Sequence, residues 1–207
     1  MVETDMTLAS TTSYVLSDDA LDTLFREART ANTWTDEPVS VEQVKDVFEL
    51  VKLGPTAMNN QPMRLLLVEK GPGRDRLVAH MSGSNAAKTA AAPLVAVVAA
   101  DTDFHERLPE HFPHAPEAIT WFGDDEGRER TAVYNAALQT AYFIIGLRAA
   151  GLGTGPQAGF DKAGVDAEFF EGTAWKSQVV INIGHPGKDA WLDRLPRISA
   201  DDAIRVV

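Results

Sequence analysis

Residues 54–62, Gly-Pro-Thr-Ala-Met-Asn-Asn-Gln-Pro, are the most informative stretch of this 207-residue chain. They follow a segment with helical spacing of apolar residues and precede a short apolar run, residues 65–68. Proline fixes φ, and glycine permits backbone angles that other residues resist, so the stretch predicts a rigid loop. Its Thr, Asn and Gln side chains suit the recognition of a flat ring with polar edges. The alternative is an ordinary surface connection between a helix and a strand.

Composition limits the classes of function. The hydrophobic fraction of 44% predicts a globular core, and a net charge of -11 argues against binding nucleic acid or anionic membranes. The chain has no cysteine, which excludes disulfides, thiolate metal sites and a cysteine nucleophile. Residues 1–13 lack the features of a signal peptide, so we expect a disordered N-terminal tail on a cytoplasmic enzyme.

Hydrophobic spacing predicts one α+β domain over residues 14–207. Ser17 and Ser40 are predicted helix caps, and Ser40 forms a capping box with Gln43. Apolar residues surround most of the helix predicted at 131–150, so we expect burial on several sides. Residues 103–127 predict an irregular, lid-like excursion, and 151–159 a loop rich in Gly and Pro. Further helices are expected near 74–81, 85–91 and 161–170, and strands at 65–69, 94–100 and 179–183.

Two patterns invite a catalytic interpretation that their context disfavours. The glycines of residues 151–155 resemble part of a dinucleotide fingerprint, but a helix rather than a strand precedes them. His105, His111 and His114 lie in a segment broken by prolines and lack the spacing of a zinc site. We therefore predict no metal site, and no acid–base dyad is evident.

Basic residues are scarce, so their positions are informative. Arg29 follows the first predicted helix, Lys88 lies one turn after Asn85, and Arg194 and Arg197 lie near the C-terminus. Phosphate prefers charge-assisted donors, so convergence of these cations would favour a phosphorylated cofactor. Isolated surface cations are the alternative.

Several segments, taken in order, resemble motifs of the nitroreductase family of FMN-dependent oxidoreductases. Residues 54–62 are similar to a Pro-Ser-x-x-Asn-x-Gln-Pro element, and 85–88 match an Asn-x-x-Lys motif. Residues 151–161 are similar to the loop over the flavin ring, and 182–186 to the last core strand and its exit. The resemblance covers about residues 19–207 and is closest to the branch with malonic semialdehyde reductase. It implies a central, mainly antiparallel sheet flanked by helices in an interwoven homodimer.

The resemblance also implies how FMN would be held. Arg29 and Thr30, with Arg197, would bind the phosphate, while Asn85 and Lys88 would face the ribityl and pyrimidine side. The full set of implied cofactor-binding residues is Arg29, Thr30, Asn32, Pro55, Thr56, Ala57, Asn59, Asn85, Lys88, Pro156, Gln157, Ala158, Gly159 and Arg197.

Three details of this implied site bear on its assembly and its departures from the family. The residues from Pro55 to Asn59 would come from the other subunit, and an amide near Ala158 would donate to flavin N5. Asn32 stands where the family often has a second basic residue, so less charge is expected on the phosphate. Residues 156–159 lack an acidic side chain that some members carry.

The implied activity is ping-pong hydride transfer from NAD(P)H through FMN to a small aldehyde such as malonic semialdehyde, or to a nitro or quinone compound. The protein would supply binding, orientation and electrostatics, and no catalytic side chain is implied. The rivals are a flavin enzyme of the dehalogenase or flavin-fragmenting type and a flavin-binding protein without turnover. Phe112, Trp121 and Phe122 either cover the acceptor or belong to a satellite core.

Overall fold

The structure is a computed structural model that describes residues 12–207. Residues 1–11, most of the predicted N-terminal tail, lie outside the described residues. The elements in chain order are α1 (Asp18–Leu21), the π-helix η1 (Asp22–Arg26), α2 (Val41–Val51), η2 (Ala57–Asn59), β1 (Met63–Val68), α3 (Pro72–Ala79), α4 (Asn85–Ala91), β2 (Leu94–Asp101), η3 (Phe104–Arg107), α5 (Leu108–His111), η4 (Pro116–Trp121), α6 (Asp125–Ala149), β3 (Gly153–Gln157), α7 (Lys162–Phe169), β4 (Trp175–Gly184) and α8 (Ala200–Ala203).

The four strands form one antiparallel sheet in the order β1-β2-β4-β3, which confirms the predicted α+β class. Every residue of β2 is buried, because this strand lies inside the sheet and both of its faces are covered. Successive side chains of a strand point to opposite faces. The apolar run at 94–100 therefore contributes side chains to the apolar packing on both faces of the sheet.

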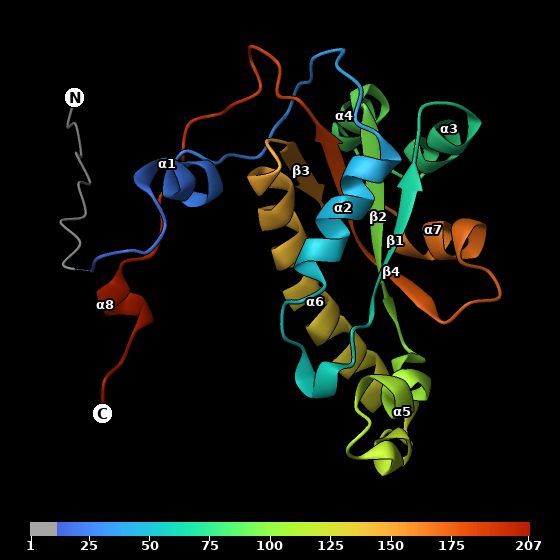
Figure 1. Ribbon diagram of the computed structural model, residues 1–207. Coiled ribbons are helices and arrows are strands. Elements are labelled where there is room, and N and C mark those ends of the chain that lie inside the picture. The colour runs from blue at the N-terminus through green and yellow to red at the C-terminus, as the bar shows by residue number, and fades with distance from the viewer. Residues whose placement is uncertain (1–11) are drawn as a thin grey trace.

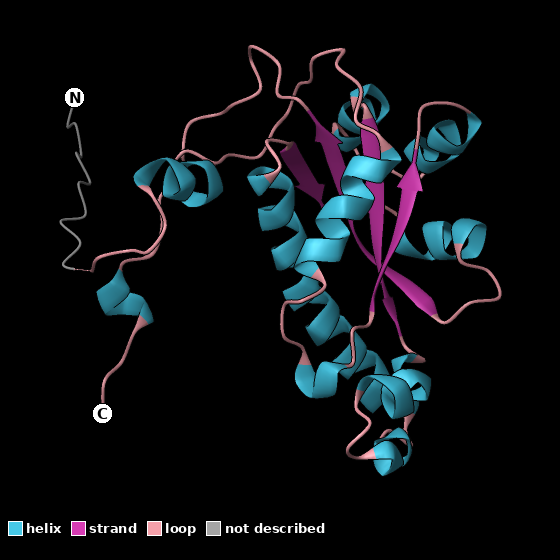
Figure 2. Ribbon diagram, viewed as in Figure 1, coloured by secondary structure: helices cyan, strands magenta, loops and turns pink. Residues whose placement is uncertain are grey.

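Helices cover the two faces of the sheet in separate sets (Figures 1 and 2). Val44 and Val47 of α2, with Phe143 and Leu147 of α6, pack on one face against Leu94 and its neighbours. The other face is covered from α3, α4 and α7. The buried residues of that second core are Val68, Leu77, Met81, Ala92, Val95, Val97, Ala99, Phe160, Val165, Phe170 and Val180.

The structure corrects several predicted elements and boundaries. The loop predicted at 151–159 is wrong for Gly153–Gln157, which form the edge strand β3 paired with β4. Helix α6 begins six residues before 131, where Asp124 caps it. The first predicted helix is a short α-helix that continues as a π-helix to Arg26. Strand β4 extends beyond the predicted 179–183 at both ends.

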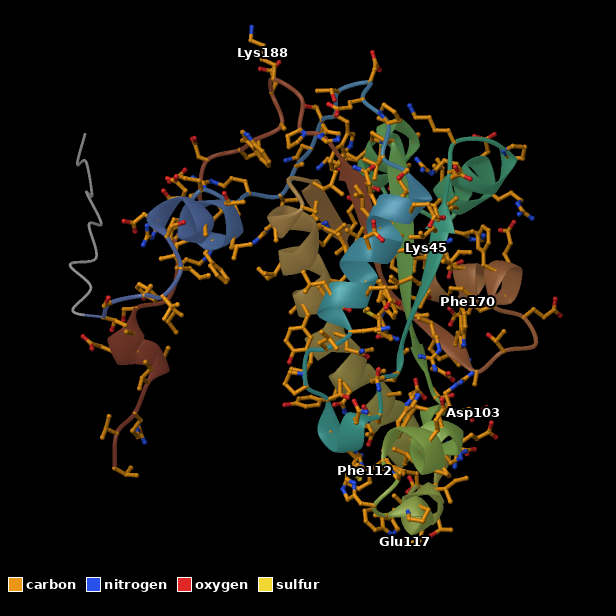
Figure 3. The ribbon with its side chains drawn as sticks, in the orientation of Figure 1. Lys45, Asp103, Phe112, Glu117, Phe170 and Lys188 are labelled. Atoms are coloured by element: carbon orange, nitrogen blue, oxygen red, sulfur yellow. The ribbon has the colours of Figure 1, made fainter. Side chains whose placement is uncertain are left out.

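The segment predicted as irregular at 103–127 consists of short helical turns between Phe104 and Trp121 around a small separate core, and its last three residues belong to α6. Phe122 packs edge-on against the buried ring of Phe104 with centroids 5.0 Å apart, and Phe112 packs on the same cluster. These two rings therefore form a satellite core, whereas Trp121 is 55% exposed. Figure 3 shows Phe112 and Glu117 at the end of the molecule opposite Lys188.

The first and last described segments of the chain depart from this body. Helix α1 and the C-terminal segment with α8 lie to one side of the sheet and its covering helices (Figure 1). The sequence did not predict α8, whose cap is Ser199. Ile204 and Val206, beyond α8, are 66% and 90% exposed. Within residues 12–207, no helix is both long and apolar enough to cross a membrane.

Candidate functional site

Three of the four basic residues singled out in the sequence converge on one pocket. The pocket has a volume of about 310 Å³ and lies between the end of η1, the last turn of α6 and the C-terminal segment. We call it the arginine pocket. Its lining residues are Ala28, Arg29, Thr30, Asn32, Arg148, Leu192, Asp193, Arg194, Leu195 and Arg197.

Backbone pairing and carbonyl contacts hold the pocket together. Thr30 forms a parallel bridge with Thr154 of β3, and the Ala31 amide donates to the Thr154 carbonyl at 2.9 Å. Arg148 Nη1 donates to the Leu24 carbonyl at 3.0 Å, and Arg194 donates to the carbonyls of Arg26 and Ala28. Carbonyls at the end of a helix lack intrahelical partners, so these arginines also cap η1.

The arginine pocket carries excess positive charge. Arg29 has a long ion pair with Glu27 at 3.8 Å, but no salt bridge joins Arg148, Arg194 or Arg197 to a carboxylate among residues 12–207. Burial lowers the pKa of Arg148, and the neighbouring charge of Arg194 lowers this pKa further. In a protein with 30 acidic and 19 basic residues, such a cluster favours an anionic ligand.

Helix α4 lies beside this pocket and contacts β3. Lys88 Nζ donates to Asn32 Oδ1 at 2.8 Å. Asn85 Nδ2 donates to the Gly159 carbonyl at 3.1 Å, and Thr89 Oγ1 donates to Gln157 Oε1 at 3.1 Å. The predicted residues 85, 88 and 156–159 therefore lie together, continuous with the arginine pocket.

Glycines in β3 let other backbone approach closely. A Cβ on Gly155 would lie 2.8 Å from the Ala31 carbonyl oxygen and 3.5 Å from the Trp34 ring. Beneath this contact, the fully buried Asn182 has both amide atoms without a hydrogen-bond partner, and Trp34 Nε1 also lacks one. Buried polar groups are usually paired, so these atoms mark a site that a further polar group would satisfy.

The 54–62 loop is held in a different place, by side chains of α6. The buried Asn135 Oδ1 accepts from the Ala57 amide at 2.8 Å, and Tyr142 Oη donates to the Pro55 carbonyl at 3.1 Å. A Cβ on Gly54 would overlap the Tyr142 ring, which explains the glycine there. The predicted rigid loop is thus tethered from one helix.

The backbone of this loop is strained. Met58 and Asn59 have φ of 51°, and Gln61 has φ of 42°. Non-glycine residues rarely adopt the left-handed region, and clusters of such residues occur at functional sites where the surroundings hold them. Asn59 Nδ2 also donates to the His111 carbonyl at 2.9 Å, which joins the loop to the irregular segment.

The loop and the arginine pocket lie at opposite ends and edges of the sheet. The loop leads into Met63, which pairs with Ala100, whereas Thr154 beside the pocket pairs with Ile183, opposite Leu94. The offset is roughly 20 Å along the strands and roughly 14 Å across them. One copy of the chain therefore brings together only part of the predicted site.

Sequence reasoning missed several residues that shape the site. It noted Arg194 without a role, counted Tyr142 only among the apolar residues of the 131–150 helix, and did not name Arg148, Asn135 or Gln139. Gln139 is 3% exposed, and its Oε1 accepts from the Met63 amide at 2.9 Å. Polar residues inside the apolar helix at 131–150 were the available signal, because a buried amide needs a partner.

The histidines do not form a metal centre. Within residues 12–207, no group of three or more His, Asp or Glu side chains is arranged to hold a metal ion. His105 and His111 each have a buried Nδ1 without a hydrogen-bond partner in the described residues, and the His114 ring packs at a tilt against Phe112 with centroids 3.9 Å apart.

Known proteins resemble this chain in sequence and in fold. A family model described as "Nitroreductase family" matches residues 25–185. Proteins named "Putative NADH dehydrogenase/NAD(P)H nitroreductase" from Streptomyces griseus and Streptomyces coelicolor are 55% and 54% identical over 196 residues, covering 94% of this chain and 100% of each relative.

Solved structures share the fold at low sequence identity. A nitroreductase family protein from Streptococcus pneumoniae has a TM-score of 0.77 at 22% identity, covering 89% of this chain and 98% of its own. A structure from Exiguobacterium sibiricum, described as a complex with FMN, has a TM-score of 0.79 at 18% identity, covering 95% and 100%.

Proposed function

This chain belongs to the nitroreductase family, and on that premise we propose that it is an FMN-dependent NAD(P)H oxidoreductase. The observation that carries the proposal is the convergence of Arg29, Arg194 and Arg197 in one pocket continuous with Lys88 and β3. A ligand with a dianionic phosphate at one end and a polar-edged ring at the other matches this arrangement.

The donor set fits FMN on two independent grounds. Among residues 12–207, the guanidinium groups of Arg148, Arg194 and Arg197 in the arginine pocket have no carboxylate partner, which suits a phosphate. Unpaired buried polar atoms of Asn182 and Trp34 lie beside β3, where Gly155 lets the backbone at Ala31 approach closely, and a polar-edged ligand would supply partners for such atoms. The structure from Exiguobacterium sibiricum, described as a complex with FMN, supports the same cofactor, and the relatives' names support NAD(P)H as the reductant.

Each group of residues then has a defined task. Arg29, Thr30 and Arg197 would hold the phosphate, and Lys88 would place positive charge beside the pyrimidine edge of the ring. The backbone at Pro156–Gly159 would line the ring, with a donor near Ala158. When bound, FMN supplies the two-electron transfer from NAD(P)H to the acceptor, and the protein supplies orientation and electrostatic stabilisation.

We further propose that two copies of the chain complete each site. The 54–62 loop cannot reach the arginine pocket of its own chain, yet strain and tethering mark it as functional. Helix α6 leaves an apolar stripe open, with Tyr134 65% exposed and Ala137 and Ala141 also exposed. A symmetric partner packed on this stripe would cover it and bring in a second loop.

The proposed acceptor is a small oxidised molecule, either an aldehyde such as malonic semialdehyde or a nitro or quinone compound. The Asn59–His111 hydrogen bond attaches the irregular segment at 103–127 to the 54–62 loop, so this segment would cover the acceptor. Trp121, the exposed aromatic residue of that segment, would contact the acceptor.

The test begins with the purified protein. Its absorption spectrum and the identity of any released cofactor are measured first, followed by NAD(P)H oxidation with aldehyde, nitro and quinone acceptors. Rapid reduction of bound FMN followed by acceptor turnover supports the oxidoreductase. Bound flavin that NAD(P)H never reduces would indicate a flavin-binding protein, and failure to bind flavin would overturn the proposal.

Substitutions test the phosphate site directly. Arg29→Ala and Arg197→Ala should each weaken FMN retention, because each removes a charged donor worth roughly 1.5–3 kcal/mol. Equilibrium dialysis against FMN measures the loss. Unchanged retention in both variants would contradict the assignment of this pocket to the phosphate.

A further inference from the structure

We propose that Arg148, in the last turn of α6, binds the cofactor phosphate directly. This inference rests on the FMN-binding function proposed above and assigns a residue that neither the motifs nor the resemblance named. Arg148 lines the arginine pocket together with Arg29, Arg194 and Arg197. Its place in the chain, far in sequence from both 29 and 197, explains why no motif reveals it.

Geometry leaves Arg148 with hydrogen-bond donors to spare. A guanidinium group has five N–H donors, and within residues 12–207 one contact, from Nη1 to the Leu24 carbonyl at 3.0 Å, holds this side chain. That contact fixes the guanidinium at the wall of the pocket, and its other N–H groups remain available to an anion. Arginine suits this role because its planar fork matches phosphate oxygens.

The Asn32 side chain cannot donate a hydrogen bond to a phosphate, although the resemblance implied that Asn32 belongs to the cofactor site. Its two Nδ2 hydrogens are engaged by the carbonyls of Thr30 at 3.1 Å and Ala190 at 3.2 Å. Its Oδ1 accepts from Lys88 Nζ at 2.8 Å. The side chain therefore orients Lys88 and offers no donor to a phosphate. Arg148 supplies the positive charge that position 32 does not.

The excess positive charge of the arginine pocket also favours a phosphate bound by Arg148. Arg148 and Arg194 repel each other across the pocket, and neither has a carboxylate partner in the described part of the chain. Asp193 is the acidic residue on the pocket wall and makes no salt bridge among the described residues. A bound dianion would relieve this repulsion, so the arrangement stabilises the complex more than the free protein.

A purely structural role makes a different prediction. Arg148 lies at the C-terminal end of α6, where a cation complements the helix dipole, and it tethers η1 through Leu24. If this were its whole role, removing its charge would weaken binding of phosphorylated and unphosphorylated flavin alike. Comparison of FMN with riboflavin separates the two roles, because they differ only in the phosphate.

The experiment uses the full-length apoprotein and flavin fluorescence titration. Arg148→Gln removes the charge but retains an amide donor, and Arg148→Lys retains the charge. The matched control is Arg130→Gln on the same helix, because the Arg130 side chain is 75% exposed and, in the described part of the chain, forms an ion pair only with Glu126 at 3.7 Å. Thermal unfolding of each apoprotein verifies that the variants fold.

We expect Arg148→Gln to weaken FMN binding by about 10- to 100-fold, the loss of one charge-assisted hydrogen bond. Riboflavin affinity should stay within about twofold of wild type. Arg148→Lys should recover part of the FMN affinity, and Arg130→Gln should match wild type for both ligands.

Other outcomes overturn the inference. If Arg148→Gln loses FMN and riboflavin affinity equally, or keeps wild-type FMN affinity, Arg148 does not contact the phosphate and serves only to hold η1. If Arg148→Gln does not fold, Arg148→Lys decides between the two roles. A change in the FMN affinity of Arg148→Lys without a change in its riboflavin affinity supports phosphate contact, whereas equal changes in both affinities refute it. A wild-type protein that binds neither flavin would overturn the proposed function itself.

Discussion

Replacement of Asn135 by alanine tests whether α6 holds the 54–62 loop in its working conformation. Asn135 is 2% exposed, and its Oδ1 accepts from the Ala57 amide at 2.8 Å. Its Nδ2 donates to the Thr131 carbonyl one turn earlier in the helix at 3.0 Å. Alanine removes both contacts and leaves the Ala57 amide without its partner.

The magnitude follows from opposing contributions. Loss of the hydrogen bond to a partly buried amide costs about 1 kcal/mol, and the small void left by the amide group costs about 1 kcal/mol more. Alanine recovers about 0.6 kcal/mol through its higher helix propensity. The net destabilisation is about 1–2 kcal/mol, which lowers Tm by about 3–6 °C for a chain of this length.

The same change should affect cofactor binding. Met58 and Gln61 hold left-handed backbone angles that cost roughly 1 kcal/mol each when the surroundings do not impose them. Without the tether, the loop relaxes and must be reordered on binding, which costs about 1 kcal/mol and lowers FMN affinity about fivefold.

Urea unfolding of the apoprotein and flavin titration measure the two effects. Glu129→Ala, an exposed change on the same helix, is the control and should stay within about 0.5 kcal/mol of wild type. The reasoning is refuted if Asn135→Ala unfolds at a lower urea concentration but binds FMN with wild-type affinity. Stability equal to wild type would refute the assigned hydrogen-bond energy.

Two further predictions concern the other half of the site. Asn32→Asp places a carboxylate against Lys88 and partly cancels the charge of the lysine. The two-electron midpoint potential of bound FMN should therefore fall by about 20–40 mV in a dye-coupled titration. An unchanged potential would mean that Lys88 does not face the ring. Gly155→Ala would put a Cβ 2.8 Å from the Ala31 carbonyl oxygen and should lower the free energy of unfolding in urea by about 1–3 kcal/mol. The control is Gly123→Ala, where the added Cβ would lie in open space and should change the unfolding free energy little. Similar losses of unfolding free energy in the two variants would contradict the close approach at Gly155.

Local chemistry predicted much of the fold. The capping box of Ser40 and Gln43 is present as the sequence indicates, with both hydrogen bonds formed. The uniformly apolar run at 94–100 becomes an inner strand, because such a run can be buried on both faces. These features were predictable because they depend on residues that are close together in the chain.

Long-range contacts decided what local patterns missed. Residues 153–157 contain Gly and Pro, which are poor strand formers, yet they pair with β4 because the glycines let neighbouring backbone approach. Phe112 and Phe122 were ambiguous in the sequence, and only their packing around Phe104 places them in a satellite core.

The candidate site divides in the same way. The sequence alone excluded cysteine chemistry, and through the family resemblance it predicted site residues near 29, 54–62, 85–88 and 156–159, because residue type and local spacing carry that information. Only the tertiary structure decided that Arg148 joins Arg29 and Arg197, and that the 54–62 loop lies at the other end of the sheet. The arginine pocket and the position of the 54–62 loop depend on which segments distant in sequence come together, and only the folded chain sets the distances between those segments.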